Sequence, residues 1–458
     1  MINRITVDKS KLLFTRKALI ALILPLMMEQ FLTVLVGMAD SIMIASVGEA
    51  AVSGVSLVDN VFILILQVLT ALATGGAVVI GQYLGSRSAG EARRAAEQLM
   101  GFLFVFSLAI TAFMYLGQDF ILHGVFGAIS DDVYVHARTY LLICSAAIPG
   151  IALYCGVAAI YRTQGDSATP MRIAIVMNAI NVCGNALLIY GLHFGTAGVA
   201  IPTLASRVVA AIIGLVILRH PNKAVYLDHI RHFRFNGGMI RRILRIGIPS
   251  GVENSLFQIG KLVVLGLITT FGTSAIAANA VSMAVANFMI LPGMSMGYAM
   301  VTVVSRCAGA GDGAQAKYYI RRLMGLTYLS MGVMTILILA VLPGIMILYN
   351  LTPETAETAT RILWTHGMMD MLIWPISFTL PNAFRAMGNA AFPMVVSILS
   401  MVLARIVFSY VFAQGMGLGV WGTWLAMILD WAVRSVVFVI YYFKGNKLHS
   451  VVAQKGLT

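Results

Sequence analysis

Four polar side chains within long apolar stretches have the chemistry of a cation site: Asp40, Asn181, Asn185 and Thr203. Asn181 and Asn185 are four residues apart and therefore share one face of a helix. Counted from the ends of the expected helices, all four side chains reach a similar depth. A carboxylate with amide and hydroxyl oxygens suits Na⁺, a hard cation that prefers oxygen ligands, and equally suits a buried carboxyl group that carries a proton. The structural alternative is a hydrogen-bond cluster between helices.

Glu29 and Glu253 occupy matching positions in the two halves of the chain, toward the expected cytoplasmic side. Glu29 also shares a helix face with Asp40, at roughly 16 Å along the axis. Substrate entry and structural pairing are equally good interpretations of the two glutamates. Asp430 and Arg434, four residues apart, instead predict an internal ion pair.

The second half offers three further candidates for contact with a substrate: Gln258, Asp370 and Trp374. Asp370 and Trp374 share a helix face and could hold an organic cation through charge and cation–π attraction. Gln258 shares a face with Lys261, whose ammonium could neutralise a nearby acid. Such pairing would weaken the interpretation of this half as a cation site, and the role of Lys261 stays open at this point.

The elements that position these residues are transmembrane helices. The 458 residues are 59% hydrophobic and only 11% charged, which is too little charge for the surface of a water-soluble protein. A spanning helix needs about 20 apolar residues. Breaks at Gly, Pro and charge clusters predict an all-α membrane protein with twelve spans, near residues 18–45, 50–80, 95–116, 134–160, 170–192, 197–219, 243–270, 275–305, 318–347, 357–384, 391–413 and 419–443.

The formal net charge of +13 reflects membrane topology rather than a nucleic-acid partner. Lys and Arg gather in the N-terminal tail, in the loops 81–95, 219–245 and 305–322, and in the C-terminal tail, whereas the opposite loops are acidic. Basic loops stay in the cytoplasm, so we expect both termini there. The basic start and the following apolar run predict a first span rather than a signal peptide. Short loops favour a bacterial inner membrane.

The two halves of the chain repeat each other at an offset of about 224 residues. The segment LPLMMEQ with Pro25 matches IPSGVEN with Pro249, and YRTQGDSATPM with Pro170 matches FRAMGNAAFPM with Pro393. Six helices in each half give both repeats the same orientation, which predicts a pseudo-twofold axis along the membrane normal. We therefore expect an N-terminal lobe over residues 1–219, a cytoplasmic linker over 220–242 and a C-terminal lobe over 243–458.

The repeated segments resemble the multidrug and toxic compound extrusion (MATE) family. The matching segments are PLMMEQFLTVLVGMAD, IGQYLGSRSAGEARRA and RTQGDSATP in the first half, and IGIPSGVEN, SAIAANAV and FRAMGNAAFP in the second. The resemblance implies a V-shaped pair of six-helix lobes that export organic cations in exchange for inward Na⁺ or H⁺. It places the family's first-helix acid at Asp40, its fifth-helix Asn at Asn181 and its sixth-helix Thr at Thr203. Where one branch of the family has a second acid on the fifth helix, this chain has Asn185, which leaves one carboxylate in the lobe.

We therefore expect an ion-coupled exporter of small, cationic, amphipathic molecules that works in the lipid membrane as a monomer, without a cofactor. The alternative on the same fold is a flippase or exporter for a lipid-linked or metabolite cargo. An enzyme is not expected, because the chain has no zinc-protease, nucleophile-elbow or nucleotide-binding motif. The four cysteines lie in apolar stretches without metal-ligand spacing.

Overall fold

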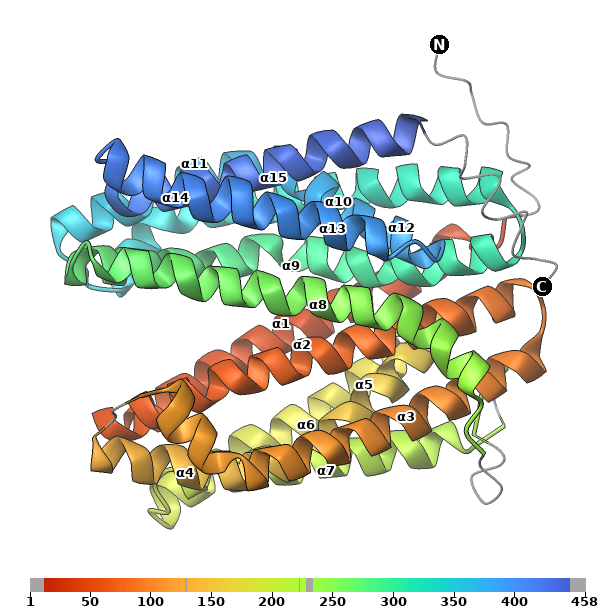
Figure 1. Ribbon diagram of the computed structural model, residues 1–458, viewed down its shortest axis with the longest axis horizontal. Helices are drawn as coiled ribbons and strands as arrows, with labels where there is room; N and C mark the ends of the chain where they lie inside the picture. Colours follow the sequence, from red (N-terminus) through yellow and green to blue (C-terminus); the bar gives the residue numbers. More distant parts are fainter. Residues whose placement is uncertain (1–11, 128–129, 222, 228–233, 445–458) are drawn as a thin grey trace. The chain divides into compact units, whose positions relative to one another are not determined.

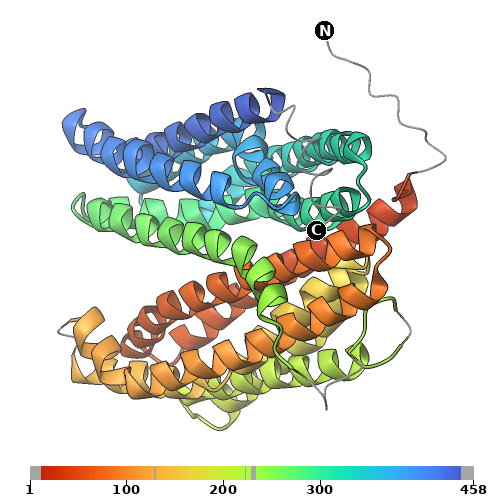
Figure 2. The same ribbon diagram turned by 45° about the vertical axis from the view of Figure 1, so that its right-hand side comes forward.

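The computed structural model describes residues 12–127, 130–221, 223–227 and 234–444. Within this part of the chain the regular structure is helical throughout, without a β-strand. The chain divides into two compact units, one formed by Lys17–Gly251 and the other by Met1–Arg16 with Val252–Thr458. Figures 1 and 2 show long, roughly parallel helices within each unit.

In the described part of the N-terminal unit there are six spans. They are α1 (Arg16–Ala45), α2 (Glu49–Gly85), α3 (Ala89–Leu116), the pair α4 (Asp131–Ser145) and α5 (Ile148–Thr163), α6 (Ala168–Ala186) with the π-helical η3 (Leu187–Gly191), and α7 (Ala197–Leu218). A short π-helix, η2 (Phe120–Val125), precedes α4. The first part of α8 (Gly237–Thr269) also belongs to this unit.

The C-terminal unit contains the rest of α8 and five further spans. They are α9 (Thr273–Gly309), α10 (Gly313–Leu348), α11 (Pro353–Trp374) with η5 (Pro375–Thr379) and α12 (Leu380–Ala386), α13 (Ala391–Ser400) with η6 (Met401–Ile406), α14 (Val407–Tyr410) and η7 (Val411–Gly415), and α15 (Gly419–Lys444). These are the twelve expected helices, with bounds within several residues of those predicted.

Apolar length alone finds fewer than twelve spans. Within the described residues, ten helices are long and apolar enough to cross a membrane, and the pair α4–α5, bent by 48°, makes an eleventh. The remaining span, residues 353–386, carries five charged residues, among them Glu354, Glu357, Arg361 and Asp370. Glu354, Glu357 and Arg361 lie in the first half of α11, Asp370 is buried in its second half, and Arg385 lies in the last turn of α12.

The unit boundary lies inside α8, at Gly251 and Val252, and not in the expected linker 220–242. The chain just before α1 also joins the C-terminal unit. The amide of Leu13 donates to Gln315 Oε1 at 3.0 Å, and the amide of Phe14 donates to the Tyr319 hydroxyl at 2.8 Å. Both acceptors belong to α10. These polar contacts to a distant helix are why residues 12–16 do not continue the N-terminal unit.

The turns between helices repeat in the two halves. Gly48 (φ 137°) precedes α2 and Gly272 (φ 90°) precedes α9, 224 residues later. Gly165 and Gly388 both have φ 87°. Glycine adopts positive φ without the steric cost that a Cβ brings, so these positions fix the turns between consecutive spans.

Within the N-terminal unit, α2 and α8 cross at two glycines. A Cβ on Gly75 would lie 2.6 Å from the Ile243 carbonyl oxygen and 2.8 Å from the Gly247 amide nitrogen. The absence of side chains allows the two backbones to approach closely, as is common between membrane helices. This contact holds the first turns of α8 against α2.

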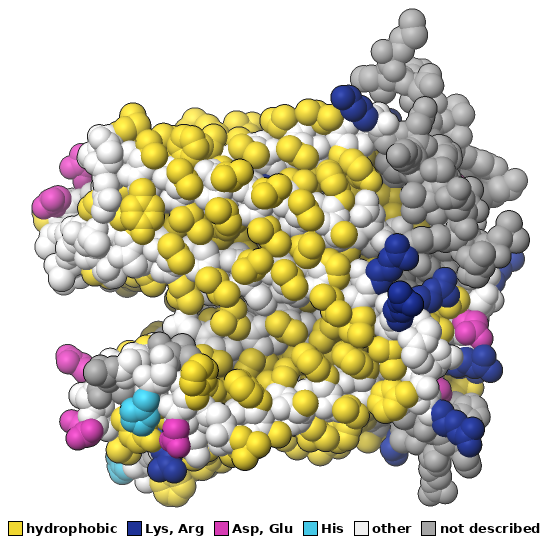
Figure 3. All heavy atoms as spheres, viewed as in Figure 1, with side chains coloured by type: hydrophobic (Ala, Val, Ile, Leu, Met, Phe, Trp, Pro, Cys, Tyr) yellow, Lys and Arg dark blue, Asp and Glu magenta, His cyan; other side chains and the backbone are white. Residues whose placement is uncertain are grey.

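Charges separate toward the two ends of the helices in each unit. Figure 3 shows hydrophobic side chains along the sides of the helices, Lys and Arg mainly at one end, and several Asp and Glu at the other. The large exposed hydrophobic residues include Leu116 and Leu348, in the last turns of α3 and α10. An apolar belt between charged ends is what a lipid-facing surface requires.

Candidate functional site

Three helices of the N-terminal unit bring the predicted cation-site residues together. Asn185 Nδ2 donates to Asp40 Oδ1 at 2.7 Å, which joins α6 to α1. Asn181 Nδ2 donates to Thr203 Oγ1 at 3.1 Å, which joins α6 to α7. Because Asn181 and Asn185 are one turn apart on α6, the two hydrogen-bonded pairs are neighbours.

Two amide oxygens of this cluster have no partner in the described part of the chain. Asn181 Oδ1 and Asn185 Oδ1 are buried and accept no hydrogen bond there. Buried polar atoms are normally satisfied, so an unpaired acceptor calls for a bound water or ion. Two amide oxygens, the Asp40 carboxylate and the Thr203 hydroxyl form an all-oxygen donor set, which fits a hard monovalent cation such as Na⁺.

The same cluster does not resemble a transition-metal centre. Among the residues that the structure describes, no three His, Cys, Asp or Glu side chains come together as metal ligands. The cluster can therefore coordinate a hard cation through oxygen atoms, or its carboxylate can bind a proton.

A second carboxylate lies beside this cluster. Asp59 on α2 accepts a hydrogen bond of 2.9 Å from the Tyr140 hydroxyl on α4. Asp59 and Arg207 are both close enough to Asp40 for their charges to act on it. The sequence predicts one carboxylate, whereas the structure places two, Asp40 and Asp59, near each other. Asp59 and Arg207 are ionisable residues inside spans, and nothing in their sequence spacing joins them to Asp40.

Glu29 and Glu253 each form an ion pair with an arginine from the same unit. Arg162 Nη2 lies 2.6 Å from Glu29 Oε1, which also accepts from the Tyr154 hydroxyl at 2.9 Å. Arg385 Nη2 lies 2.5 Å from Glu253 Oε2. These two arginines occupy matching positions in the repeat. The structure thus favours pairing over substrate entry for both glutamates.

Asp370 and Trp374 are both buried inside the C-terminal unit. Asp370 is 0% exposed and accepts one long hydrogen bond, of 3.3 Å, from Thr335. Trp374 lies in the hydrophobic core of its unit and stacks on Phe378 with ring centroids 4.9 Å apart. The tryptophan ring is therefore occupied by core packing. Gln258 is partly exposed and forms no hydrogen bond within the described residues, so it remains free to contact a substrate.

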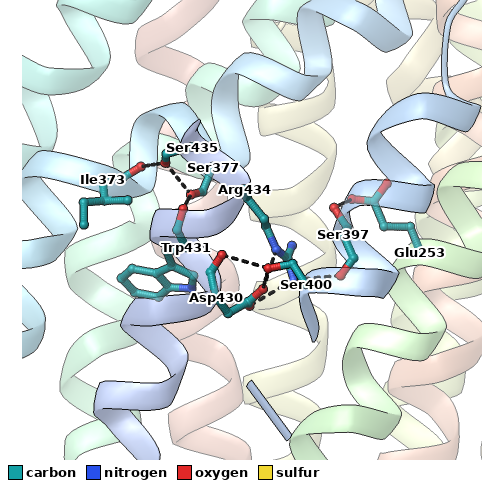
Figure 4. Close-up of polar contacts among 9 residues, drawn as sticks. All are labelled: Glu253, Ile373, Ser377, Ser397, Ser400, Asp430, Trp431, Arg434 and Ser435. Carbon is teal, nitrogen blue, oxygen red and sulfur yellow. Dashed lines mark hydrogen bonds and ion pairs between the residues drawn. The ribbon is translucent and has the colours of Figure 1, made fainter. Parts of the chain in front are cut away.

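Asp430 and Arg434 form the ion pair that their spacing predicts. Arg434 Nε donates to Asp430 Oδ1 at 2.8 Å and Nη2 donates to Oδ2 at 3.0 Å. Ser400 donates to the same carboxylate at 2.6 Å. Figure 4 shows this network between α13 and α15, with Ser397 linking it to Glu253.

Lys261 does not neutralise an acid. In the described part of the chain its ammonium forms no ion pair, and it lies 5.0 Å from the centre of the Phe257 ring. The positive charge of Lys261 is therefore uncompensated by a direct carboxylate contact.

Comparison with known proteins matches nearly the whole chain. The MatE family model matches residues 25–187 and again residues 249–411, two segments 224 residues apart (249 − 25), which confirms the internal repeat. The Bacillus subtilis transporter YisQ is 28% identical over 432 residues, covering 92% of each chain. A Thermotoga maritima protein described as the probable multidrug resistance protein NorM is 27% identical, covering 94% of this chain and 93% of its own.

The fold also matches solved structures. A multidrug resistance MATE family transporter of the MOP superfamily, in an outward-facing conformation, aligns with a TM-score of 0.88 at 20% identity. The alignment covers 96% of this chain and 97% of that one. At this identity the likeness supports the architecture of twelve helices in two units, and the site rests on the geometry described above.

Proposed function

The chain belongs to the MATE family of multi-pass membrane transporters, and from this premise we propose that it exports small organic molecules in exchange for Na⁺ or H⁺ entering the cell. The relatives named above as multidrug resistance proteins support an organic cargo. We further propose that it works as a monomer in a bacterial inner membrane, with both termini in the cytoplasm and no cofactor. The cargo of this proposal is amphipathic and cationic.

The observation that carries ion coupling is the Asp40 cluster. A carboxylate held by Asn185, beside two amide oxygens that accept no hydrogen bond from the described residues, supplies both the charge and the oxygen ligands for a cation. Asp40 would hold the cation electrostatically, while Asn181, Asn185 and Thr203 would replace its water shell. A cation that binds one conformation of the transporter better than another shifts the population toward it. This differential binding would couple the ion gradient to export.

The test is ion-driven transport in liposomes that contain the purified protein. A fluorescent organic cation such as ethidium is followed while a Na⁺ gradient and a pH gradient are imposed in separate experiments. We expect one gradient to drive transport, and Asp40→Asn to lower the initial rate at least about tenfold, because the variant loses a charged ligand. The active gradient identifies the coupling ion.

Asp132→Asn is the matched control, because Asp132 is an exposed acid at the start of α4, away from the Asp40 cluster. It should transport like the wild type. Each variant is first checked for a monodisperse, folded state by gel filtration. If the Asp40→Asn variant transports the dye as fast as the wild type does, the assignment of Asp40 as the coupling residue is contradicted. Failure of both gradients to drive any dye would contradict ion-coupled export of this cargo.

A further inference from the structure

One arginine inside the C-terminal unit lacks, among the described residues, the partners that a buried guanidinium requires. Arg405 lies in η6 and is 5% exposed. Its Nε and Nη1 atoms are buried and donate to no acceptor within the residues that the structure describes. Burying a charged donor without an acceptor is costly. The π-helical stretch that carries Arg405 is also of a kind that often occurs at functional sites.

Arg405 and two further cations lie around one aromatic ring, that of Phe257. Phe257 on α8 has Lys261 Nζ 5.0 Å, Arg434 Cζ 5.1 Å and Arg405 Cζ 5.2 Å from its ring centre. Lys261 is partly exposed and lies one turn after Phe257 on α8. Phe257 also contacts Phe378 edge to face, with centroids 5.8 Å apart. Positive charge and aromatic surface therefore meet at one place in this unit.

The neighbouring acids are already occupied. Asp430 uses both oxygens on Arg434 and accepts from Ser400 as well (Figure 4). Glu253 uses one oxygen on Arg385 and the other on Ser397. In the described part of the chain neither carboxylate forms an ion pair with Arg405 or Lys261. The cluster thus keeps two positive charges without a paired carboxylate, and unused guanidinium donors.

We propose that Lys261 and Arg405 form a subsite for the carboxylate or phosphate group of an amphipathic substrate, with Phe257 against its apolar part. The inference rests on the proposed export function and extends its cargo from cations to zwitterions and anions. Guanidinium groups bind carboxylate and phosphate through paired, charge-assisted hydrogen bonds, and an adjacent ammonium adds charge. An anionic oxygen group would satisfy the donors that the protein leaves unpaired.

The experiment compares one dye in two charge states. A rhodamine free acid is zwitterionic at neutral pH, and its methyl ester is a cation of nearly the same size. Binding of both dyes to the purified protein is measured by fluorescence anisotropy. We expect Arg405→Gln and Lys261→Gln each to weaken binding of the free acid about tenfold or more, and binding of the ester less than about twofold. Arg405→Lys should restore part of the loss.

Arg361→Gln is the control variant, because Arg361 is an exposed cation of the same unit that stacks on Trp421. It should leave both dyes unaffected. Equal losses for the two dyes in Lys261→Gln and Arg405→Gln, or no loss for either, would overturn the subsite. If Arg405→Gln does not fold, Lys261→Gln on the partly exposed face of α8 decides the matter alone.

A second arm distinguishes the source of the anionic group. A short-chain phosphatidic acid is added as a competitor. If the lipid competes with the free acid, and Arg405→Gln abolishes this competition, the result supports the subsite and identifies a lipid phosphate as a ligand. Displacement of the free acid by a soluble carboxylated amphiphile, but not by the lipid, supports it with a carboxylate cargo. Binding is measured without an ion gradient, so it stands or falls separately from ion-coupled transport.

Discussion

At the scale of single residues, each unit keeps a buried glutamate next to an arginine from another part of the fold. Arg162 pairs with Glu29 in the N-terminal unit, and Arg385 pairs with Glu253 in the C-terminal unit. Removing one partner of a buried pair leaves the other charge without compensation, which costs more than losing both. The duplicated pair therefore serves as an internal test of how the repeat is stabilised.

Arg385→Met should destabilise the protein by about 3–5 kcal/mol, because Glu253 keeps only its Ser397 hydrogen bond. The double variant Glu253→Gln with Arg385→Met should recover part of that loss. Thermal unfolding of the purified protein, followed by the intrinsic fluorescence of tryptophan, measures both. A double variant less stable than Arg385→Met would contradict the prediction that the uncompensated charge of Glu253 causes most of the loss.

The sequence predicts the Asp40 cluster only in part. Helical spacing and depth, counted from the helix ends, were enough to group Asp40 with Asn181, Asn185 and Thr203. Asp59 was not included in this prediction. Its hydrogen-bond partner Tyr140 lies on α4, and the position of α4 depends on the bend before α5. The arginine partners of the two glutamates were not predicted either, because periodicity within one helix does not show which arginine approaches from another helix.

At the scale of helices, the crossing of α2 and α8 depends on the absence of a side chain at Gly75. Gly75→Ala would place a Cβ against the backbone of Ile243 and Gly247, so the helices must separate. We expect a loss of roughly 1–3 kcal/mol in stability, seen as a lower unfolding temperature.

Gly266→Ala on α8 is the matched control for Gly75→Ala. A Cβ at Gly266 meets no atom within 4 Å, and alanine is the better helix former by up to about 1 kcal/mol. This variant should be as stable as the wild type or more so. Equal unfolding temperatures for the wild type and Gly75→Ala would show that the crossing tolerates a methyl group.

The turn before α6 should respond to pH, whereas its repeat-related turn should not. Asp166 accepts from the Thr169 amide at 3.1 Å and pairs with Lys223 at 3.1 Å. Burial raises the pKa of Asp166, but the hydrogen bonds from Thr169 and the Lys223 ammonium outweigh burial and lower it below 3.8. The stabilisation is therefore present above about pH 4 and is lost as pH falls through the lowered pKa.

Asp166→Ala should cost about 1 kcal/mol at neutral pH, as loss of a side-chain cap does, and less at pH 3. Asn389 holds the matching turn through the Phe392 amide at 3.3 Å and does not titrate. The cost of Asn389→Ala should therefore be the same at both pH values. Unfolding temperatures of the two variants at neutral and acidic pH make the comparison, and a pH-independent cost for Asp166→Ala would contradict the assigned ion pair.

Helix positions could be predicted well and their internal irregularities could not. Long apolar runs between Gly, Pro and charged residues located all twelve spans within several residues. The π-helical stretches η3, η5, η6 and η7 and the bend at residues 145–148 left no mark on hydrophobic periodicity, because they depend on packing between helices. Arg405 lies in one of these stretches, so its unpaired donors could be recognised only in the folded chain.

At the scale of the whole molecule, the charged ends of the helices predict orientation. Arg87 lies in the loop after α2, and Arg162 and Arg306 lie in the last turns of α5 and α9, whereas Glu49, Asp131, Glu354 and Glu357 lie at opposite helix ends. Basic loops stay in the cytoplasm. A green fluorescent protein fused after Lys444 should therefore lie in the cytoplasm and fluoresce. An alkaline phosphatase inserted at Thr352 should lie on the outer side of the membrane and be active. The reverse pattern would place both termini outside and contradict the orientation.

The unpaired donors of Arg405 have an electrical consequence. A zwitterion held at Lys261 and Arg405 carries no net charge, so its exchange for one Na⁺ or H⁺ moves one positive charge into the cell per cycle. A monovalent cationic cargo exchanged one for one moves none. Each transferred charge is worth about 2.3 kcal/mol for every 100 mV of membrane potential. The voltage of the cell would thus drive the export of zwitterions and leave one-for-one exchange of cations to the concentration gradients alone.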